Sequence, residues 1–531
     1  MFASDLLARK GIIHSPKGNI RTPSFVPVVH PEPSKNLVTV ADFQQEFNID
    51  FIITSSYILR KRFNKTIKDL HELTSFAGPI MTDSGAFQSL LYGEIELLPE
   101  EVIKFQEEIG SDFAVPLDIP ISLTDSFETA HEKVKITIQR AKEALEISSK
   151  ASTCWVAPIQ GGKFLSLVER SAKELTQINF YSMFAIGSVV ELMNNYRYDT
   201  LLQIILTAKK FLAPEKPLHL FGAGHPAMFP FIVAAGIDTF DSAAYSLYAQ
   251  DGRYLTNTQT FLLKDLDEFP CNCPICSKTT PNELLNQPKL QQIQALAKHN
   301  LYICQAEIKT IREAISSGTL WNLLESRSRA HPALRKGFDV LLKHSSILLE
   351  NTPSTKKKGC FYVSESDSQR PEVLLHQQRL KNIDLTKRKK LIIFSLLANR
   401  DINELYSVFT RVKEFFKVNK SLIEEFDFWI INDYYGIIPL ELIEVYPLAQ
   451  SVFMEKITNI NRKFIIEDIF RRIKKWSYQE IILAGNLNSL YDYFIEENYY
   501  LESRRKIKSY NFIISNKHFQ DLEFFLNSLI K

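Results

Sequence analysis

Short runs of β-branched and aromatic residues alternate with longer stretches of helical periodicity between Phe51 and Asp241. Helix candidates such as Glu128–Ile147 and Tyr198–Phe211 separate these runs and are rich in good helix formers. Repeated βα units of this kind predict a parallel sheet, either doubly wound or closed into a barrel. The chain has no GxGxxG turn, and the number of units favours an α/β fold built on an eight-stranded barrel. The predicted strands are Phe51–Thr54, Ile80–Thr82, Phe113–Leu117, Cys154–Ile159, Phe184–Ile186, Leu218–Phe221 and Thr239–Asp241.

The chain changes character after the predicted barrel. Asp265–Ser346 contains a cysteine-bearing loop and then helices, one of which runs through Gln291–Ser316, so we expect an appended subdomain. Asn351–Lys358 (NTPSTKKK) predicts a solvated linker, because proline, small polar residues and consecutive lysines favour an exposed chain. The expected regions are therefore a barrel over residues 1–265, a cysteine-bearing helical subdomain over 266–350 and a C-terminal region over 359–531.

The last third of the chain again alternates strand-like and helix-like segments. Beyond Lys390 the glycines thin to Gly436 and Gly485, while Phe, Tyr, Ile, Asn and Lys dominate. This pattern predicts a second α/β layer. Its predicted strands are Leu391–Leu397, Phe428–Ile431, Ile481–Ala484 and Phe512–Ile514, with helices that include Ile402–Phe416 and His518–Ile530.

Composition narrows the class of protein. Hydrophobic residues make up 45% of the 531 residues and charged residues 23%, which is ordinary for a globular protein and excludes wholesale disorder. Lysine and arginine number 63 against 61 acidic residues, so the chain is not basic throughout. It begins without a signal-peptide pattern, and it contains no apolar run long enough to span a membrane. We therefore expect a soluble, cytoplasmic protein.

Polar residues and glycines follow the predicted strands where each strand ends. In a βα barrel the carboxyl ends of all strands meet on one face, so these residues predict a single pocket. Each aspartate alone could instead cap the following helix, which is worth about 1 kcal/mol. Three acids beside a glutamine favour a catalytic pocket, since two carboxylates can divide attack and proton transfer at a sugar carbon. The residues are Asp83, Asp118, Gln160 with Gly161–Gly162, Gly187, Gly222 and Asp241.

Three of the six cysteines lie within six residues of one another, which indicates a metal site rather than disulfides. Three thiolates and one imidazole form the closed tetrahedral site of structural zinc. A zinc hydrolase is the alternative, but it would need an open coordination position on the metal, which this ligand set does not leave. His299 is the first good histidine candidate, although it could be a core histidine instead, and His331 and His344 are further candidates. The expected ligands are Cys271, Cys273, Cys276 and His299, while Cys154, Cys304 and Cys360 are expected to pack in the interior.

Four basic clusters occur towards the C-terminus. Each alone is typical of a solvated face, but together they favour a surface that binds phosphates. The alternative is that the C-terminal region mediates protein contacts. The clusters are Lys356–Lys358, Lys387–Lys390, Arg471–Lys475 and Arg504–Lys508.

Several motifs, in order along the chain, resemble those of the archaeal-type tRNA-guanine transglycosylases. The resemblance runs from the N-terminus to about residue 345 and implies a TIM barrel with a zinc-binding subdomain. It implies exchange of guanine 15 in the tRNA D-arm for 7-cyano-7-deazaguanine, as the first tRNA-level step of archaeosine biosynthesis. The motifs are MTDSGAFQ at Met81–Gln88, LDIP at Leu117–Pro120, IQGG at Ile159–Gly162, HLFGAGHP at His219–Pro226, FDSAAYSLYAQDGRY at Phe240–Tyr254, and CNCPICSKTTPNEL at Cys271–Leu284 with His299.

The resemblance also implies roles for single residues. It makes Asp241 the nucleophile that attacks the ribose and Asp83 the general acid/base. Asp118 accepts the ring N–H and amine of the base, Gln160 binds its carbonyl edge and Phe87 stacks on its face. One zinc ion per chain, held by the four expected ligands, and a homodimer are implied as well.

The remaining implied substrate-binding residues include one departure from the family pattern. Ser188 stands where the family usually has a second glycine, beside Gly187, whose backbone amide reaches the base. We expect Ser188 to narrow the pocket for the cyano group. The other residues of this set are Ser84, Val189 and Val190.

The tail resembles a different protein. Arg370–Leu380 (RPEVLLHQQRL) and Asn432–Pro447 (NDYYGIIPLELIEVYP) are similar to a domain of archaeosine synthase, although the Pro-Cys-Lys-Pro-Tyr-Ser signature of that enzyme is absent. Archaeal transglycosylases usually end in a glycine-rich PUA barrel, which this terminus does not resemble. The tail itself or a separate PUA-containing subunit would then hold the tRNA. A non-catalytic tRNA-binding subunit of the same fold is the alternative, but it would lose a carboxylate, and both Asp83 and Asp241 are present.

Overall fold

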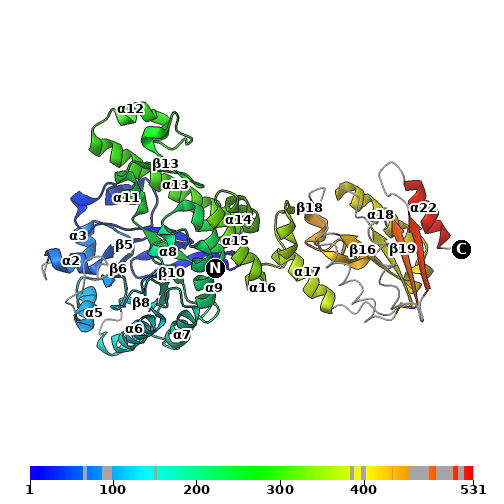
Figure 1. Ribbon diagram of the computed structural model, residues 1–531, viewed down its shortest axis with the longest axis horizontal. Helices are drawn as coiled ribbons and strands as arrows, with labels where there is room; N and C mark the ends of the chain where they lie inside the picture. The colour runs from blue at the N-terminus through cyan, green and yellow to red at the C-terminus, as the bar shows by residue number, and fades with distance from the viewer. Residues whose placement is uncertain are drawn as a thin grey trace. The chain divides into compact units, whose positions relative to one another are not determined.

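The computed structural model consists of two compact units, Met1–Thr352 and Pro353–Lys531. A ring of helices surrounds a barrel of strands in the first unit, and the second unit contains an open sheet with helices (Figure 1). The structure describes residues 1–63, 69–86, 98–148, 152–382, 388–395, 402–432, 434–453, 478–485, 506–511 and 519–529.

Eight parallel strands form the barrel, in the order β4-β11-β10-β9-β8-β7-β6-β5. A bridge from Val28 to Ile53 and a 2.8 Å hydrogen bond from the Val29 N–H to the Ile53 carbonyl join the two ends of this order. The predicted eight-stranded TIM barrel is therefore confirmed. Its strands are β4 (Ser24–Pro27), β5 (Ile52–Ser55), β6 (Ile80–Asp83), β7 (Phe113–Ala114), β8 (Cys154–Ile159), β9 (Met183–Ile186), β10 (Leu218–Leu220) and β11 (Thr239–Ser242).

Two details of the barrel differ from the sequence prediction. Strand β4 was not predicted, because its four residues end in a proline within a proline-rich stretch that resembles a loop. Strand β7 has two residues instead of the five of Phe113–Leu117. The side-chain amide of Gln106 bonds the backbone N–H and carbonyl of Val115 at 3.3 and 3.0 Å, so a side chain replaces the neighbouring strand there.

An antiparallel sheet precedes the barrel and was not predicted either. Its strands are β1 (Ala3–Asp5), β2 (Ala8–Ser15) and β3 (Gly18–Thr22). Ile20 of β3 is fully buried in the cluster of apolar residues inside the barrel. The sheet therefore contributes to the interior of the barrel.

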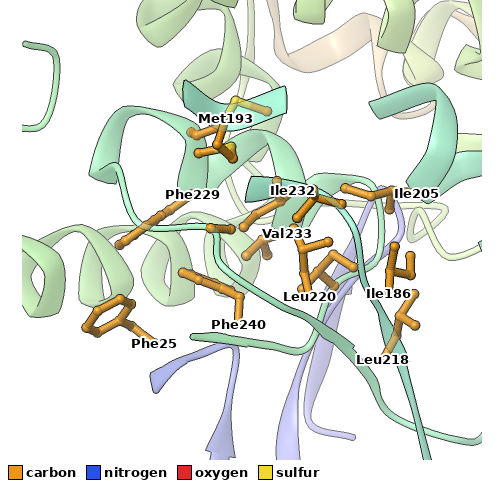
Figure 2. Close-up of a cluster of buried hydrophobic side chains, with 14 of the residues drawn as sticks. Phe25, Ile186, Met193, Ile205, Leu218, Leu220, Phe229, Ile232, Val233 and Phe240 are labelled. Atoms are coloured by element: carbon orange, nitrogen blue, oxygen red, sulfur yellow. The ribbon is translucent and has the colours of Figure 1, made fainter. Parts of the chain in front are cut away.

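Apolar side chains pack on both sides of the barrel wall. In β8, Val156 belongs to the inner cluster and Trp155 to the outer cluster, which is the alternation expected of a barrel strand. The Phe229 ring on α10 (Phe229–Ala234) lies 4.6 Å from the ring of Phe240 and 5.6 Å from that of Phe25. Burial of each such side chain stabilises the fold by about 1.5–3 kcal/mol. Figure 2 shows part of this outer cluster, where Ile186, Leu218, Leu220 and Phe240 lie near Ile205, Ile232 and Val233.

Helices enclose the barrel, and those after the cysteine loop share its core. Trp321 and Phe338, from two of these later helices, are fully buried in the same cluster as the barrel residues. No helix in the described part of the chain is long and apolar enough to cross a membrane. The elements are α1 (Val40–Gln45), α2 (Ser56–Phe63), α3 (Leu70–Thr74), α5 (Pro99–Glu108), α6 (Phe127–Ile147), α7 (Leu165–Thr176), α8 (Val190–Asn194), α9 (Tyr198–Lys209), α10 (Phe229–Ala234), α11 (Ala244–Gln250), β12 (Arg253–Leu255), β13 (Thr260–Leu262), α12 (Pro281–Leu285), α13 (Lys289–Ser317), α14 (Leu320–Ser328), α15 (Pro332–Lys343) and α16 (Ser345–Leu348).

The second unit is built on a five-stranded sheet in the order β17-β16-β15-β19-β20. All neighbours pair in parallel except β17, which lies antiparallel at one edge. The predicted strand Phe512–Ile514 and the basic cluster Arg471–Lys475 lie outside the described residues. The elements are β14 (Cys360–Tyr362), α17 (Pro371–Asn382), β15 (Lys390–Ser395), α18 (Ile402–Val418), α19 (Lys420–Glu425), β16 (Phe426–Asn432), β17 (Gly436–Pro439), β18 (Ser451–Phe453), β19 (Glu480–Gly485), β20 (Lys506–Asn511) and α22 (Phe519–Ser528).

Lys356 corrects the expectation of a uniformly solvated linker. Its side chain is fully buried, and its Nζ lies 2.6 Å from a carboxylate oxygen of Glu372, which is also buried. Arg370 contacts the same carboxylate at 3.2 Å. Burial alone would raise the pKa of Glu372, but the charges of Lys356 and Arg370 lower it to about 2. Lys357 and Lys358 are exposed, as expected.

Candidate active site and metal centre

The polar residues expected in one pocket all lie at the carboxyl ends of the barrel strands. Asp83 is the last residue of β6, and Asp241 lies near the end of β11. Asp118 follows β7, and Gln160 comes directly after β8. Because all these strands run parallel in one barrel, the four side chains belong to one face.

Asp83 lies in surroundings that favour its protonated form. Burial is the main cause that raises the pKa of Asp83 to about 7, and the charges of Asp241 and Asp118 add to the effect. The Ser55 hydroxyl and the Gly85 N–H, whose nitrogen lies 2.8 Å from Oδ1, oppose it by stabilising the carboxylate. A carboxyl group with this pKa can donate or accept a proton near neutral pH.

Asp241 is held by two N–H donors. Its Oδ1 lies 3.1 Å from Nε2 of His219 and 3.1 Å from the backbone nitrogen of Gly222. Nδ1 of His219 lies 2.8 Å from the Thr239 hydroxyl, which can donate to it and so leave the ring proton on Nε2. His219 is completely buried, so this arrangement fixes the orientation of the Asp241 carboxylate.

Gly222 is required at its position for two reasons. Its φ of 71° is a left-handed conformation that side chains rarely adopt, and a Cβ there would lie 2.4 Å from Cγ2 of Val190. The glycine therefore allows the backbone N–H to reach Asp241. Val190, which was expected in the base pocket, covers Gly222, whereas Val189 is buried in the outer cluster.

His219 is a site residue to which the sequence motifs assign no role. It stands between two leucines of β10 that belong to the outer cluster, so it faces the barrel interior. Its register partner on β11 is Thr239, two residues before Asp241. A histidine on the inner side of a barrel strand near the pocket is the sequence signal that could have identified it.

Asp118, Gln160 and Ser84 form one hydrogen-bonded group. Gln160 Nε2 donates to Asp118 Oδ2 at 2.6 Å, and the Ser84 hydroxyl donates to Oδ1 at 3.0 Å. Burial raises the pKa of Asp118, while these two hydrogen bonds oppose the shift. The three side chains offer an acceptor and an amide N–H side by side, which suits the edge of a purine-like base. Phe87, expected to stack on that base, lies outside the described residues.

The helix-cap alternative does not hold for two of the three aspartates. The N-cap of α6 is Ser126, so Asp118 does not cap that helix. The N-cap position of α11 is Ala243, so Asp241 does not cap the helix that follows it. Both carboxylates are therefore free of the commonest structural role for an aspartate after a strand.

The four expected metal ligands lie together in the first unit. Their ligand atoms all lie within 4.8 Å of one another and could hold a metal ion. The sulfurs of Cys273 and Cys276 are 3.5 Å apart, and Nδ1 of His299 lies 3.5 and 3.2 Å from them. A tetrahedral zinc site with these ligand types separates such atoms by about 3.5–3.8 Å. The donors present therefore suit a tetrahedral ion.

His299 is oriented for this cluster by its other ring nitrogen. Nε2 lies 2.9 Å from the Leu255 carbonyl, so it carries the proton and leaves Nδ1 to face the thiols. The Tyr254 ring stacks on the imidazole at 3.7 Å. His331 caps α15, and Nδ1 of His344 contacts the Val340 carbonyl, so neither of these alternative candidates belongs to the cluster.

The chain is similar to proteins of one family over most of its length. The sequence model of the queuine tRNA-ribosyltransferase family matches residues 5–333. A tRNA-guanine(15) transglycosylase of Methanococcus aeolicus is 38% identical over 519 residues, which are 95% of this chain and 75% of the relative. Proteins of the same name from Methanocaldococcus jannaschii and Sulfolobus acidocaldarius are 38% and 35% identical, over 92% and 91% of this chain and 74% and 94% of the relatives. The similarity therefore extends into the second unit.

Proposed function

The chain belongs to the queuine tRNA-ribosyltransferase family, and we propose that it is a tRNA-guanine(15) transglycosylase of archaeosine biosynthesis. It exchanges the guanine at position 15 of tRNA for a purine-like base, for which we propose 7-cyano-7-deazaguanine. The observation that carries this proposal is the position of Asp83 and Asp241 at strand ends of the barrel, in a chain 38% identical to a transglycosylase of that name.

The reaction is a double displacement on the ribose. The carboxylate of Asp241 attacks the anomeric carbon and forms an ester, while the bond from that carbon to guanine breaks and Asp83 gives its proton to the departing base. The incoming base then loses a proton to Asp83, and its nitrogen attacks the same carbon and releases Asp241. One glycosidic bond forms for each that breaks, so no nucleotide hydrolysis is needed.

His219 and Gly222 support the first displacement. Their two N–H groups hold Oδ1 of Asp241 in a fixed direction, so the carboxylate need not reorganise before it attacks. The pKa of Asp83, raised to about 7, suits a group that is protonated in the first step and ionised in the second.

Asp118, Gln160 and Ser84 form the base-binding end of the pocket. A carboxylate accepts the ring N–H and amine of a guanine-like edge, and the Gln160 amide donates to its carbonyl. The side chains of Phe87 and Val190 complete this proposed site. Gly187 was expected to offer its backbone N–H to the base, but that N–H donates to the Ile159 carbonyl at 3.1 Å, so Gly187 provides space beside the Gln160 amide instead. Guanine 15 must leave its stack to enter, at a cost of a few kcal/mol.

We further propose that the metal of the cysteine cluster is zinc, one ion per chain, because three thiols and an imidazole nitrogen are the donors that zinc prefers. With all four positions filled by protein, the ion supports the fold around β12 and α13. We also propose a homodimer and a cytoplasmic location, which the family and the tRNA substrate support. A separate PUA-containing subunit is proposed because the tail does not resemble a PUA barrel.

Base exchange tests the proposal directly. Incubation of the protein with a guanine-15 tRNA transcript and radiolabelled guanine should place label at nucleotide 15, and the unlabelled cyano base should compete. Asp339→Asn, an exposed acid on α15, serves as a control and should behave like the wild type. Label at another nucleotide, or none with the wild-type protein, would refute the assignment.

A further inference from the structure

Ser188 connects three neighbouring loops of the pocket through one hydroxyl group. Its Oγ accepts the backbone N–H of Ile121 at 2.7 Å and donates to Oε1 of Gln160 at 2.5 Å. Ile121 lies in the loop after β7, which carries Asp118, and Gln160 lies directly after β8. Ser188 itself lies after β9. The hydroxyl therefore joins the loops that follow three successive strands of the barrel.

The backbone of Ser188 is strained. Its φ is 60°, in the left-handed region, which costs a residue with a side chain about 1–2 kcal/mol. Glycine adopts this conformation without that cost. A serine in this strained conformation therefore indicates that its hydroxyl makes hydrogen bonds that glycine cannot make.

The hydroxyl sets the direction of the Gln160 side-chain amide. With Oε1 occupied by the Ser188 O–H, Nε2 faces Oδ2 of Asp118 at 2.6 Å. The reversed amide would place Oε1 against that carboxylate, which is unfavourable. One hydrogen of Nε2 is used by Asp118, and the other remains to meet a base carbonyl.

Gly187 provides the space for this arrangement. A Cβ at that position would lie 2.4 Å from Nε2 of Gln160. The Gly187–Ser188 pair thus combines a residue without a side chain, over which the amide lies, and a residue whose hydroxyl holds the amide.

We propose that Ser188 is a positioning residue that fixes the Gln160 amide for recognition of the carbonyl edge of the base, an inference that rests on the proposed function. The strain at Ser188 and its contacts with two loops serve that single orientation. Ser188 acts on the binding of the free base rather than on the displacement at the ribose.

The test combines base affinity with stability. Ser188→Gly should raise the KM for guanine in the exchange reaction about five- to tenfold, which corresponds to the loss of one hydrogen bond to the base. The kcat should change little. Its Tm should stay within about 1–2 °C of the wild type, because relief of the strain and loss of the two hydrogen bonds oppose each other. Ser188→Ala should raise KM equally but lower Tm.

A second left-handed serine provides the matched control. Ser75, with a φ of 55° at the end of α3, precedes the amino end of β6 and so lies away from the pocket. Ser75→Gly should raise Tm without a change in KM. In a Gln160→Ala background, Ser188→Gly should add no further increase in KM, because the amide that it orients is absent.

Two results would overturn the inference. An unchanged KM in an active Ser188→Gly protein would show that the hydroxyl has no positioning role. Additive effects of Ser188→Gly and Gln160→Ala on KM would show that Ser188 acts through another group. Absence of exchange by the wild-type protein is a distinct result, which would refute the proposed function and this inference with it.

Discussion

The surroundings of Asp83 suit proton transfer but lower the stability of the folded protein. The burial and neighbouring carboxylates that raise its pKa to about 7 also make its ionised form unfavourable in the folded protein. The donors Ser55 and Gly85 reduce this penalty without removing it. A pocket that gathers Asp83, Asp118 and Asp241 is therefore a destabilised part of the fold, as expected of an active site.

The first prediction concerns the pH dependence of Asp83. Because it must be protonated to donate to the departing guanine, the first displacement should slow as pH rises above about 7. The folded-state pKa lies above the ordinary value of 3.8, so the stability due to the protonated group is present below about pH 4 and lost as pH rises to about 7. Asp83→Asn should abolish turnover. The Tm of this variant minus that of the wild type should be about 2–5 °C larger at pH 8 than at pH 5.

Thermal unfolding at the two pH values, with Asp339→Asn as the control, checks this prediction. The control replaces an exposed acid and should show the same Tm difference at both pH values. An Asp83→Asn protein with a Tm difference independent of pH would contradict the raised pKa.

At the scale of elements, the cysteine loop and α13 meet at the candidate metal site. His299 on α13 faces the cysteines of the loop, and its other nitrogen bonds the end of β12. A bound ion would therefore link β12, the loop and α13.

The second prediction is the loss of this link on substitution of a cysteine. Cys273→Ser should lower the zinc content from one ion per chain and reduce Tm by about 5–10 °C, without a selective effect on exchange at low temperature. Metal analysis and thermal unfolding measure these effects. Cys154→Ser, which alters a thiol outside the cluster, should keep its zinc. Full zinc content in the Cys273→Ser protein would disprove the ligand set.

Periodicity predicted most elements, because each buries one face of a regular pattern. The helix expected over Tyr198–Phe211 is α9, and the strand expected over Cys154–Ile159 has those bounds in the structure. Contacts made by single polar side chains were not predictable in this way. Gln106 bonds the backbone of Val115 nine residues away, and the buried Lys356 pairs with Glu372 sixteen residues away. Hydrophobic periodicity does not identify such partners, because it records only which residues face the core.

The candidate site was predictable to a similar extent. Residues with distinctive chemistry at strand ends, such as Asp83 and Asp241, indicate a pocket from their places in the sequence alone. The supporting contacts of His219 and Ser188 depend on which face of a strand is inward and on a backbone angle. Neither follows from the motifs, so their roles required the three-dimensional structure.

At the scale of the whole molecule, the second unit has its own core and exposed lysines. Lys357, Lys358 and Lys389 are exposed, whereas Arg388 and Lys390 pair with carboxylates within the unit. We expect the exposed lysines to contact tRNA phosphates. The alternative is that this unit recruits another protein.

The third prediction separates these roles by truncation after Thr352, the end of the first unit. The truncated protein should remain folded, bind tRNA more weakly and show a flatter salt dependence, by about 0.7–0.9 logarithmic unit for each phosphate that the second unit neutralises. Titrations of tRNA affinity against salt for both proteins measure the slopes. Identical slopes would favour the recruiting role.

The central claim is that Asp241 forms a covalent bond to the ribose of tRNA, and the most direct measurement is the trapping of that adduct. Wild-type protein mixed with tRNA and then denatured should yield a protein–tRNA species on a denaturing gel, with the linkage at Asp241 by mass spectrometry. Asp241→Asn should yield none, because an amide is too weak a nucleophile. An adduct that persists in the Asp241→Asn protein, or one attached elsewhere in the wild type, would contradict the account.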